Sequence, residues 1–95
     1  MIALSDLEAR PVFSAPLGLT PQVQWLTRAI LDDPDAPVHY LLRGEEWLVC
    51  GRWTEARTDF EMALTLSEKL LISSAWGYIF QAYIDRAEAG LRRCP

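Results

Sequence analysis

The sequence predicts an all-α protein, built as a stack of antiparallel helix-turn-helix units. Three observations support this fold class. Apolar residues recur at spacings of three and four along most of the chain, small residues fall where neighbouring helices would touch, and prolines and glycines separate the periodic stretches. We expect one helical domain over residues 20–95, preceded by an N-terminal arm at residues 1–19.

Composition limits the function classes. The chain has 95 residues, of which 51% are hydrophobic and 23% charged, so it has enough apolar surface for one folded domain. The net charge is -4 and no basic stripe is visible, so nucleic acid and anionic membranes are poor partners. No apolar run reaches the roughly 18 residues of a membrane span. We therefore expect a cytoplasmic protein that is not inserted into a membrane.

The arm at residues 1–19 contains one short helix signal. Ser5 and Glu8 have the spacing of a capping box, and Pro11 ends any helix that starts there. We expect the arm to lie on the helical body or to swap onto a neighbouring chain.

Two helices are predicted next. Thr20 and the proline that follows it predict a helix over residues 21–32, because Thr caps a helix start and Pro suits its first position. A second helix is expected to start after a cap at Asp35 and to run to about Cys50. Gly51 suits the left-handed backbone that ends a helix.

The C-terminal half is predicted to hold two more helices. One should run from about Thr54 to Ser67, and the other should be a single long capping helix over residues 68–93. The long helix is expected because its apolar residues continue at spacings of three and four without a proline. This stripe consists of Ile72, Trp76, Ile79, Tyr83, Ala87 and Leu91.

Small and aromatic residues in the middle of the chain mark where two helices should pack. They are Tyr40, Gly44, Trp47, Gly51, Trp53, Ala56, Phe60 and Ala63. Their order resembles the tetratricopeptide repeat (TPR), a helix-turn-helix unit of about 34 residues. Residues 37–70 resemble one complete repeat, with Arg43 where Leu is usual and Glu68 where Pro is usual. The resemblance implies a right-handed TPR-like stack with degenerate half-repeats on both sides.

The same resemblance implies a binding groove lined by the first helix of each pair. In this sequence the groove positions are Val38, Leu41, Glu45, Leu48 and Val49, followed by Leu71, Ser74, Tyr78, Gln81 and Ala82. These positions are mostly apolar, so we expect the groove to bind a partner helix or an extended hydrophobic segment. Leu41 and Glu45 stand where carboxylate-binding adaptors of this family have basic or amide residues, which disfavours that type.

Catalytic, metal and cofactor sites are not expected. His39 is the only histidine, and we expect a structural or solvent-facing role for it. Glu45 and Glu46 are adjacent, so on a helix they point about 100° apart and form no catalytic pair. The two cysteines have no partner at metal-ligand spacing, so we expect neither a metal site nor a disulfide.

The functional prediction is a non-enzymatic module that binds a protein or peptide partner. Small acidic chains of this type resemble the chaperones of bacterial type III secretion, which is one alternative. A structural homo-oligomer with a self-occluded groove, for example a homodimer, is another. If the groove is open, Leu41→Glu or Leu48→Glu should abolish partner capture and leave the helix content intact.

Overall fold

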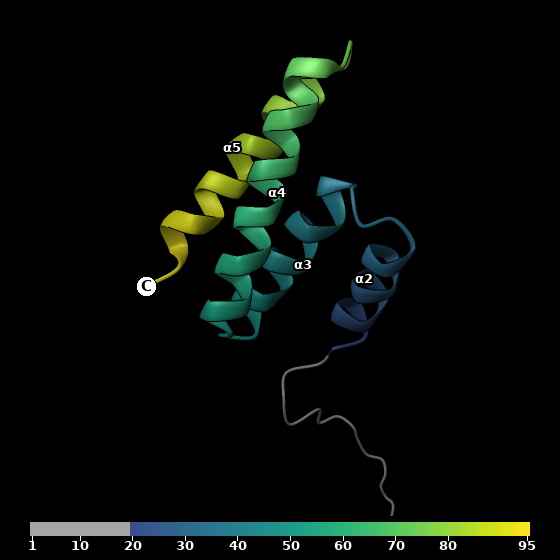
Figure 1. The fold of residues 1–95 in the computed structure, drawn as a ribbon. Helices are drawn as coiled ribbons and strands as arrows, with labels where there is room; N and C mark the ends of the chain where they lie inside the picture. Colours follow the sequence, from purple (N-terminus) through teal and green to yellow (C-terminus); the bar gives the residue numbers. More distant parts are fainter. Residues whose placement is uncertain (1–19) are drawn as a thin grey trace, which may run out of the picture.

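The computed structural model describes residues 20–95, which form four helices and no strand: α2 (Pro21–Asp32), α3 (Pro37–Val49), α4 (Trp53–Ser73) and α5 (Gly77–Arg93) (Figure 1). The predicted all-α class is therefore confirmed for this part of the chain. The predicted arm at residues 1–19 lies outside the described residues.

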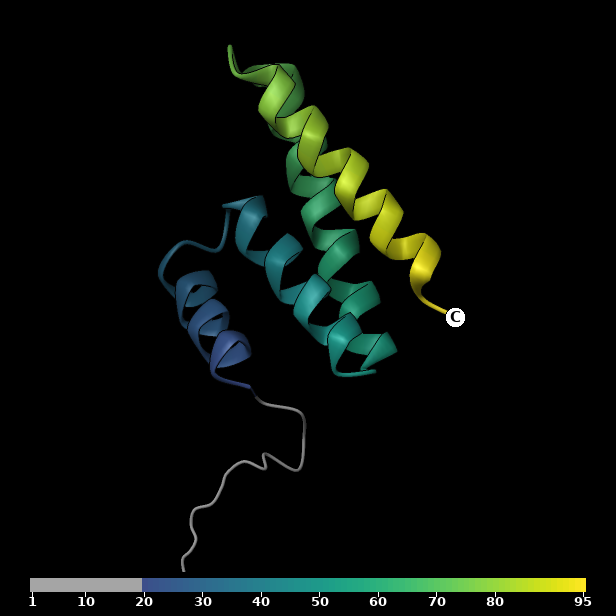
Figure 2. The same ribbon diagram turned by 180° about the vertical axis from the view of Figure 1, so that it is seen from behind.

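The helices make a chain of neighbour contacts. α3 contacts α4, and α4 contacts α5 along much of its length, as the reverse view in Figure 2 shows. α5 also contacts α3, whereas α2 contacts α3 alone among the helices described. The fold thus consists of a three-helix body, α3–α4–α5, and one helix attached to its side.

The ends of α2 and α3 follow from local chemistry. The predicted cap at Thr20 is confirmed, since its Oγ1 accepts the Val23 backbone N–H at 3.1 Å. The predicted cap of the next helix, Asp35, is wrong: Ala36 holds the N-cap position and Pro37 the first helical position. Proline sets the helix start here by fixing its own φ. Gly51 follows α3 with a φ of 74°, so the predicted left-handed turn is confirmed.

The boundary between the last two helices differs from the prediction. α4 does not end at Ser67 but runs on to Ser73, and α5 starts only at Gly77. Ser67 is fully buried, so packing continues through the predicted break. The real break is at Ser74, whose backbone is extended and whose Oγ accepts the Trp76 N–H at 3.0 Å. A serine hydroxyl that bonds a nearby N–H offers an alternative to helical pairing.

This break overturns the N-terminal part of the predicted stripe over residues 68–93. Ile72 is 87% exposed and Trp76 60% exposed, so neither belongs to the core. The C-terminal part of the stripe is confirmed, because Ala87 is buried and Tyr83 and Leu91 pack against the core. α5 also buries Ile84 and Gly90, which the stripe does not include.

Phe60 lies at the centre of the body. Its side chain is fully buried, and its ring lies against two glycines on different helices. A Cβ added to Gly44 of α3 would lie 2.9 Å from the ring, and one added to Gly90 of α5 would lie 2.3 Å from it. The predicted close approach at Gly44 is confirmed, whereas Gly90 was not singled out in the sequence. Both glycines are needed because real Cβ atoms do not come this close to another carbon.

A largely buried ion pair joins α3 to α4, and a hydrogen bond from the same arginine reaches α2. Arg43 of α3 donates two hydrogen bonds to the carboxylate of Asp59 on α4, at 2.7 and 2.8 Å, and a third to the Thr27 hydroxyl of α2 at 3.0 Å. The Asp59 side chain is 4% exposed. Its hydrogen bonds raise the pKa of the Arg43 guanidinium above the ordinary value. Arg43 therefore links α2 to the body through a polar contact where the repeat pattern usually has Leu.

Candidate functional site

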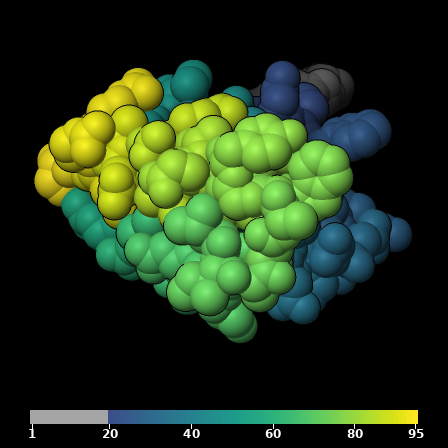
Figure 3. All heavy atoms as spheres, turned by 90° about the horizontal axis from the view of Figure 1, so that it is seen from above, coloured from purple at the N-terminus to yellow at the C-terminus, as the bar shows by residue number. Residues whose placement is uncertain are grey.

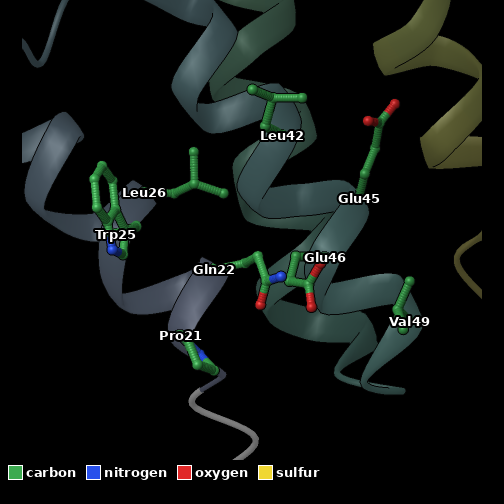
Figure 4. Close-up of a pocket in the computed structure, with 8 residues that line it drawn as sticks. All are labelled: Pro21, Gln22, Trp25, Leu26, Leu42, Glu45, Glu46 and Val49. Atoms are coloured by element: carbon green, nitrogen blue, oxygen red, sulfur yellow. The ribbon is translucent and has the colours of Figure 1, made fainter.

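An open hollow of about 650 Å³ lies between α2 and α3. We call it the α2–α3 hollow (Figure 4). Four residues of α2 and four of α3 line it: Pro21, Gln22, Trp25, Leu26, Leu42, Glu45, Glu46 and Val49. Because the two walls come from separate helices, the shape of the hollow depends on how α2 docks on α3.

Four contacts hold α2 in place beside α3. Val23 and Ile30 bury the inner face of α2. The Tyr40 hydroxyl donates to the Pro34 carbonyl oxygen at 2.8 Å, which ties α3 to the connection after α2. At the other end, the Thr20 hydroxyl donates to Glu46 Oε2 at 3.3 Å. Together with the Arg43–Thr27 bond, these contacts set the spacing of the two walls.

The hollow is mostly apolar and open to solvent. Trp25 is 79% exposed, Val49 78% and Leu42 38%. A large aromatic ring and two aliphatic side chains on adjacent exposed walls are unusual for a surface that meets only water. Trp25 also borders a second, smaller hollow with Arg28 and Asp32, so this ring forms a ridge between two depressions.

The charged groups of the hollow are carboxylates, and the Gln22 amide is its other polar side chain. Glu45 and Glu46 are both partly buried, and no basic side chain lines the hollow. Glu45 is already paired across the body with Arg86 of α5, at 2.6 Å and 3.2 Å. Glu46 accepts the Thr20 hydroxyl, and no basic residue within 20–95 forms an ion pair with it. The local charge is therefore negative.

The predicted groove residues of α3 lie in three different environments. Glu45 and Val49 line the α2–α3 hollow, and Val38 is partly buried outside it. Leu41 is fully buried and Leu48 is 6% exposed. The expectation that Leu41→Glu or Leu48→Glu would spare the fold is wrong, because either change puts a carboxylate into the core.

The predicted groove residues of the C-terminal half do not meet this hollow. Leu71 lies in the last turn of α4 and Ser74 in the break, both partly buried, so neither is on the expected helix. Tyr78, Gln81 and Ala82 are exposed on α5. Tyr78 instead stands beside Trp76, with ring centroids 6.3 Å apart, near the end where α4 meets α5. Figure 3 looks down on this end.

Most predicted repeat-packing residues are buried. Tyr40, Gly44, Trp47, Ala56, Phe60 and Ala63 belong to the interior. The two exceptions are exposed: Gly51 in the turn after α3, and Trp53, with 42% exposure, at the first position of α4. Trp25, Leu26 and Leu42, which line the hollow, were not assigned to a groove in the sequence. No local pattern within residues 21–32 shows that Trp25 faces solvent while Val23 and Ile30 face α3.

The histidine and the two cysteines are among the side chains considered from the sequence for metal binding or catalysis. No group of three or more metal-ligating side chains occurs in residues 20–95. His39 is partly buried, and its Nδ1 has no hydrogen-bond partner there. Burial and the nearby Glu46 raise the pKa of the Cys50 thiol, which keeps it protonated at neutral pH. Cys50 and Cys94 do not form a disulfide with each other.

Comparisons with protein-family models, curated proteins and solved structures found no match to this chain. No helix within residues 20–95 is both long and apolar enough to cross a lipid bilayer.

Proposed function

We propose that this protein is a non-enzymatic interaction module that binds an apolar protein segment in the α2–α3 hollow. The observation that carries the proposal is the exposure of Trp25, Leu42 and Val49 on the two helices that line the hollow. Covering these side chains removes apolar surface from water, at about 25 cal/mol per Å². A secretion chaperone that shields an apolar stretch of its client is one form of this function.

We also propose that the body is TPR-like. Support comes from Gly44, which meets the Phe60 ring, and from Ala56 and Ala63, which are fully buried on α4. These are the contacts that the repeat pattern predicts between its two helices. In such a stack α5 occupies the place of the terminal capping helix.

The binding function can be tested with matched surface variants. Val49→Asp puts a charge into the hollow, whereas Ile72→Asp makes the same kind of change at an equally exposed site far from it. The probe is a fluorescent amphipathic helical peptide, and binding is followed by anisotropy. We expect Val49→Asp to weaken binding at least about tenfold and Ile72→Asp to leave it unchanged. Circular dichroism should show equal helix content. Absence of peptide binding to the wild type would overturn the function.

A structural homo-oligomer is the second candidate. It is favoured by a separate apolar cluster at the α4–α5 end, where Ile72 is 87% exposed, Tyr78 69% and Trp76 60%. Light scattering on the purified full chain distinguishes this homo-oligomer from the partner-binding module. A dimer that Trp76→Ser dissociates supports self-assembly, and a monomer at all concentrations removes this candidate.

A further inference from the structure

The two sides of α3 differ in what covers them. On one side α5 packs against both α3 and α4. On the other side α2 contacts α3 alone, and the α2–α3 hollow is left beside it. The α3 wall of the hollow runs from Leu42 to Val49, which is about 10 Å, or two helical turns. A helix placed there would contact α2 and α3 together, as α5 contacts α3 and α4.

The charges on α3 show which helix would fit. Glu45 points towards α5 and is paired with Arg86. Glu46 is the next residue, about 100° further around the helix. It borders the hollow, partly buried, with a hydroxyl partner but no basic partner among residues 20–95. A cationic side chain on a helix bound in the hollow would form an ion pair with Glu46, as Arg86 does with Glu45.

The sequence disfavours two sources of such a helix. The stretch before α2 contains Pro11 and Pro16, and a proline in a helix interior costs about 3 kcal/mol. A second copy of the chain also has a net charge of -4, so it offers no overall charge complementarity to the negatively charged hollow. A basic helix from a different protein meets neither obstacle.

We infer that the α2–α3 hollow binds an amphipathic helix of another protein, with a Lys or Arg beside its apolar stripe that pairs with Glu46. The inference rests on the proposed function and specifies its partner. Trp25 and Val49 contact the apolar stripe, and Glu46 sets the orientation of the helix and discriminates against acidic helices.

Three synthetic peptides of about 14 residues test this on the full chain. The first has a leucine stripe flanked by Arg, the second has Glu in place of Arg, and the third keeps Arg but replaces the leucines by Ser. Their affinities are measured by anisotropy at low salt. We expect the Arg–Leu peptide to bind about tenfold more tightly than the Glu–Leu peptide, and the Arg–Ser peptide to bind weakest.

Variants separate the charge from the apolar contact. Glu46→Gln should reduce the tenfold preference to about twofold and still accept the Thr20 hydroxyl. Glu61→Gln, at an exposed site of α4, should preserve the preference. Raising the salt concentration should shrink the preference as well, because the pair lies at the edge of the hollow.

The outcomes separate the inference from the function. Equal binding of the Arg–Leu and Glu–Leu peptides overturns the inference and leaves the function standing, whereas no binding of any peptide overturns both. If Phe13→Asp in the full chain increases peptide affinity about tenfold, the chain's own residues 1–19 occupy the hollow and the inference is wrong. A dimer that Val49→Asp dissociates would identify a second copy as the occupant, which also overturns it.

Discussion

At the scale of single residues, the body is organised by one aromatic ring and the two glycines beside it. Phe60 of α4 can lie deep between α3 and α5 only because Gly44 and Gly90 have no Cβ. A glycine in a helix interior costs about 1 kcal/mol relative to Ala. The close packing of a fully buried ring offsets this cost.

Gly90→Ala should destabilise the protein by about 2 kcal/mol, because its Cβ would lie 2.3 Å from Phe60 Cζ and the buried ring has no free space to move into. Gly77→Ala is the matched control, since its Cβ would meet only Leu71, at 3.4 Å, and the change should be neutral or stabilise by up to about 1 kcal/mol. Urea denaturation measures both. If Gly90→Ala were as stable as the wild type, the close contact would be refuted.

The Arg43–Asp59 pair leads to an asymmetric prediction. Arg43→Leu should cost about 3–5 kcal/mol, because it leaves the Asp59 carboxylate buried without a partner. Asp59→Leu should cost less, since the Arg43 side chain is 20% exposed and can turn towards water. The double variant should recover much of the loss, because two apolar side chains bury no charge. Equal losses in the two single variants, measured by urea denaturation, would contradict this account.

The pH dependence of the same pair follows from the raised pKa of Arg43. A raised folded-state pKa contributes stability below the unfolded-state pKa, and this contribution is lost only as pH rises through the folded-state value. For an arginine that loss falls in strongly alkaline solution. The contribution of Arg43 to stability is therefore expected to stay constant across neutral pH, which denaturation at several pH values checks.

At the scale of elements, α2 depends on its N-cap residue more than the other helices do. Thr20 caps the helix through the Val23 N–H, and its hydroxyl also donates to Glu46 of α3. Neither α3, α4 nor α5 has a side-chain cap bond at its N-terminus. The Thr20 side chain therefore caps the N-terminus of α2 and also attaches that terminus to α3, next to the hollow.

Thr20→Ala should cost about 1 kcal/mol through the lost cap. Thr54→Ala, near the start of α4 where no side chain caps, is the matched control and should change stability by less than about 0.5 kcal/mol. Thermal denaturation compares the two variants. Equal effects would mean that the Thr20 hydroxyl does not act as a cap.

At the scale of the whole molecule, stability should be uneven. α5 contacts two helices and α4 lies between two neighbours, whereas α2 contacts α3 alone. A helix held by one neighbour opens without unfolding the remainder. The wall of the hollow that carries Trp25 is therefore the less stable one, which suits a surface that adjusts to a partner.

Hydrogen exchange followed by mass spectrometry tests whether α2 opens more easily than the other helices. Amides of α2 should exchange well before those of α4, and a peptide bound in the hollow should slow exchange in α2 much more than in α5. Simultaneous exchange of all four helices would show instead that the molecule opens as one unit.

Much of the fold could be predicted from local signals. Thr20, Pro21 and Gly51 act within one helical turn, so the start of α2 and the end of α3 are readable along the chain. The boundary between α4 and α5 was misplaced, because the periodicity of apolar residues continues through a break made by Ser74 and its hydrogen bond to the backbone of Trp76. Of the eight residues that line the candidate site, the sequence predicts only Glu45 and Val49 as groove residues, and it does not predict Trp25.

The sequence by itself determined that the chain is helical, where most helices begin, and that Gly44 meets a neighbour. Only the tertiary structure decided that Gly90 meets the same ring, that Arg43 pairs with Asp59, and that the exposed Trp25 and Val49 line one hollow from separate helices. The physical reason is distance along the chain. Caps and turns involve residues a few positions apart, whereas these contacts join separate helices and depend on the angle and phase at which the helices pack.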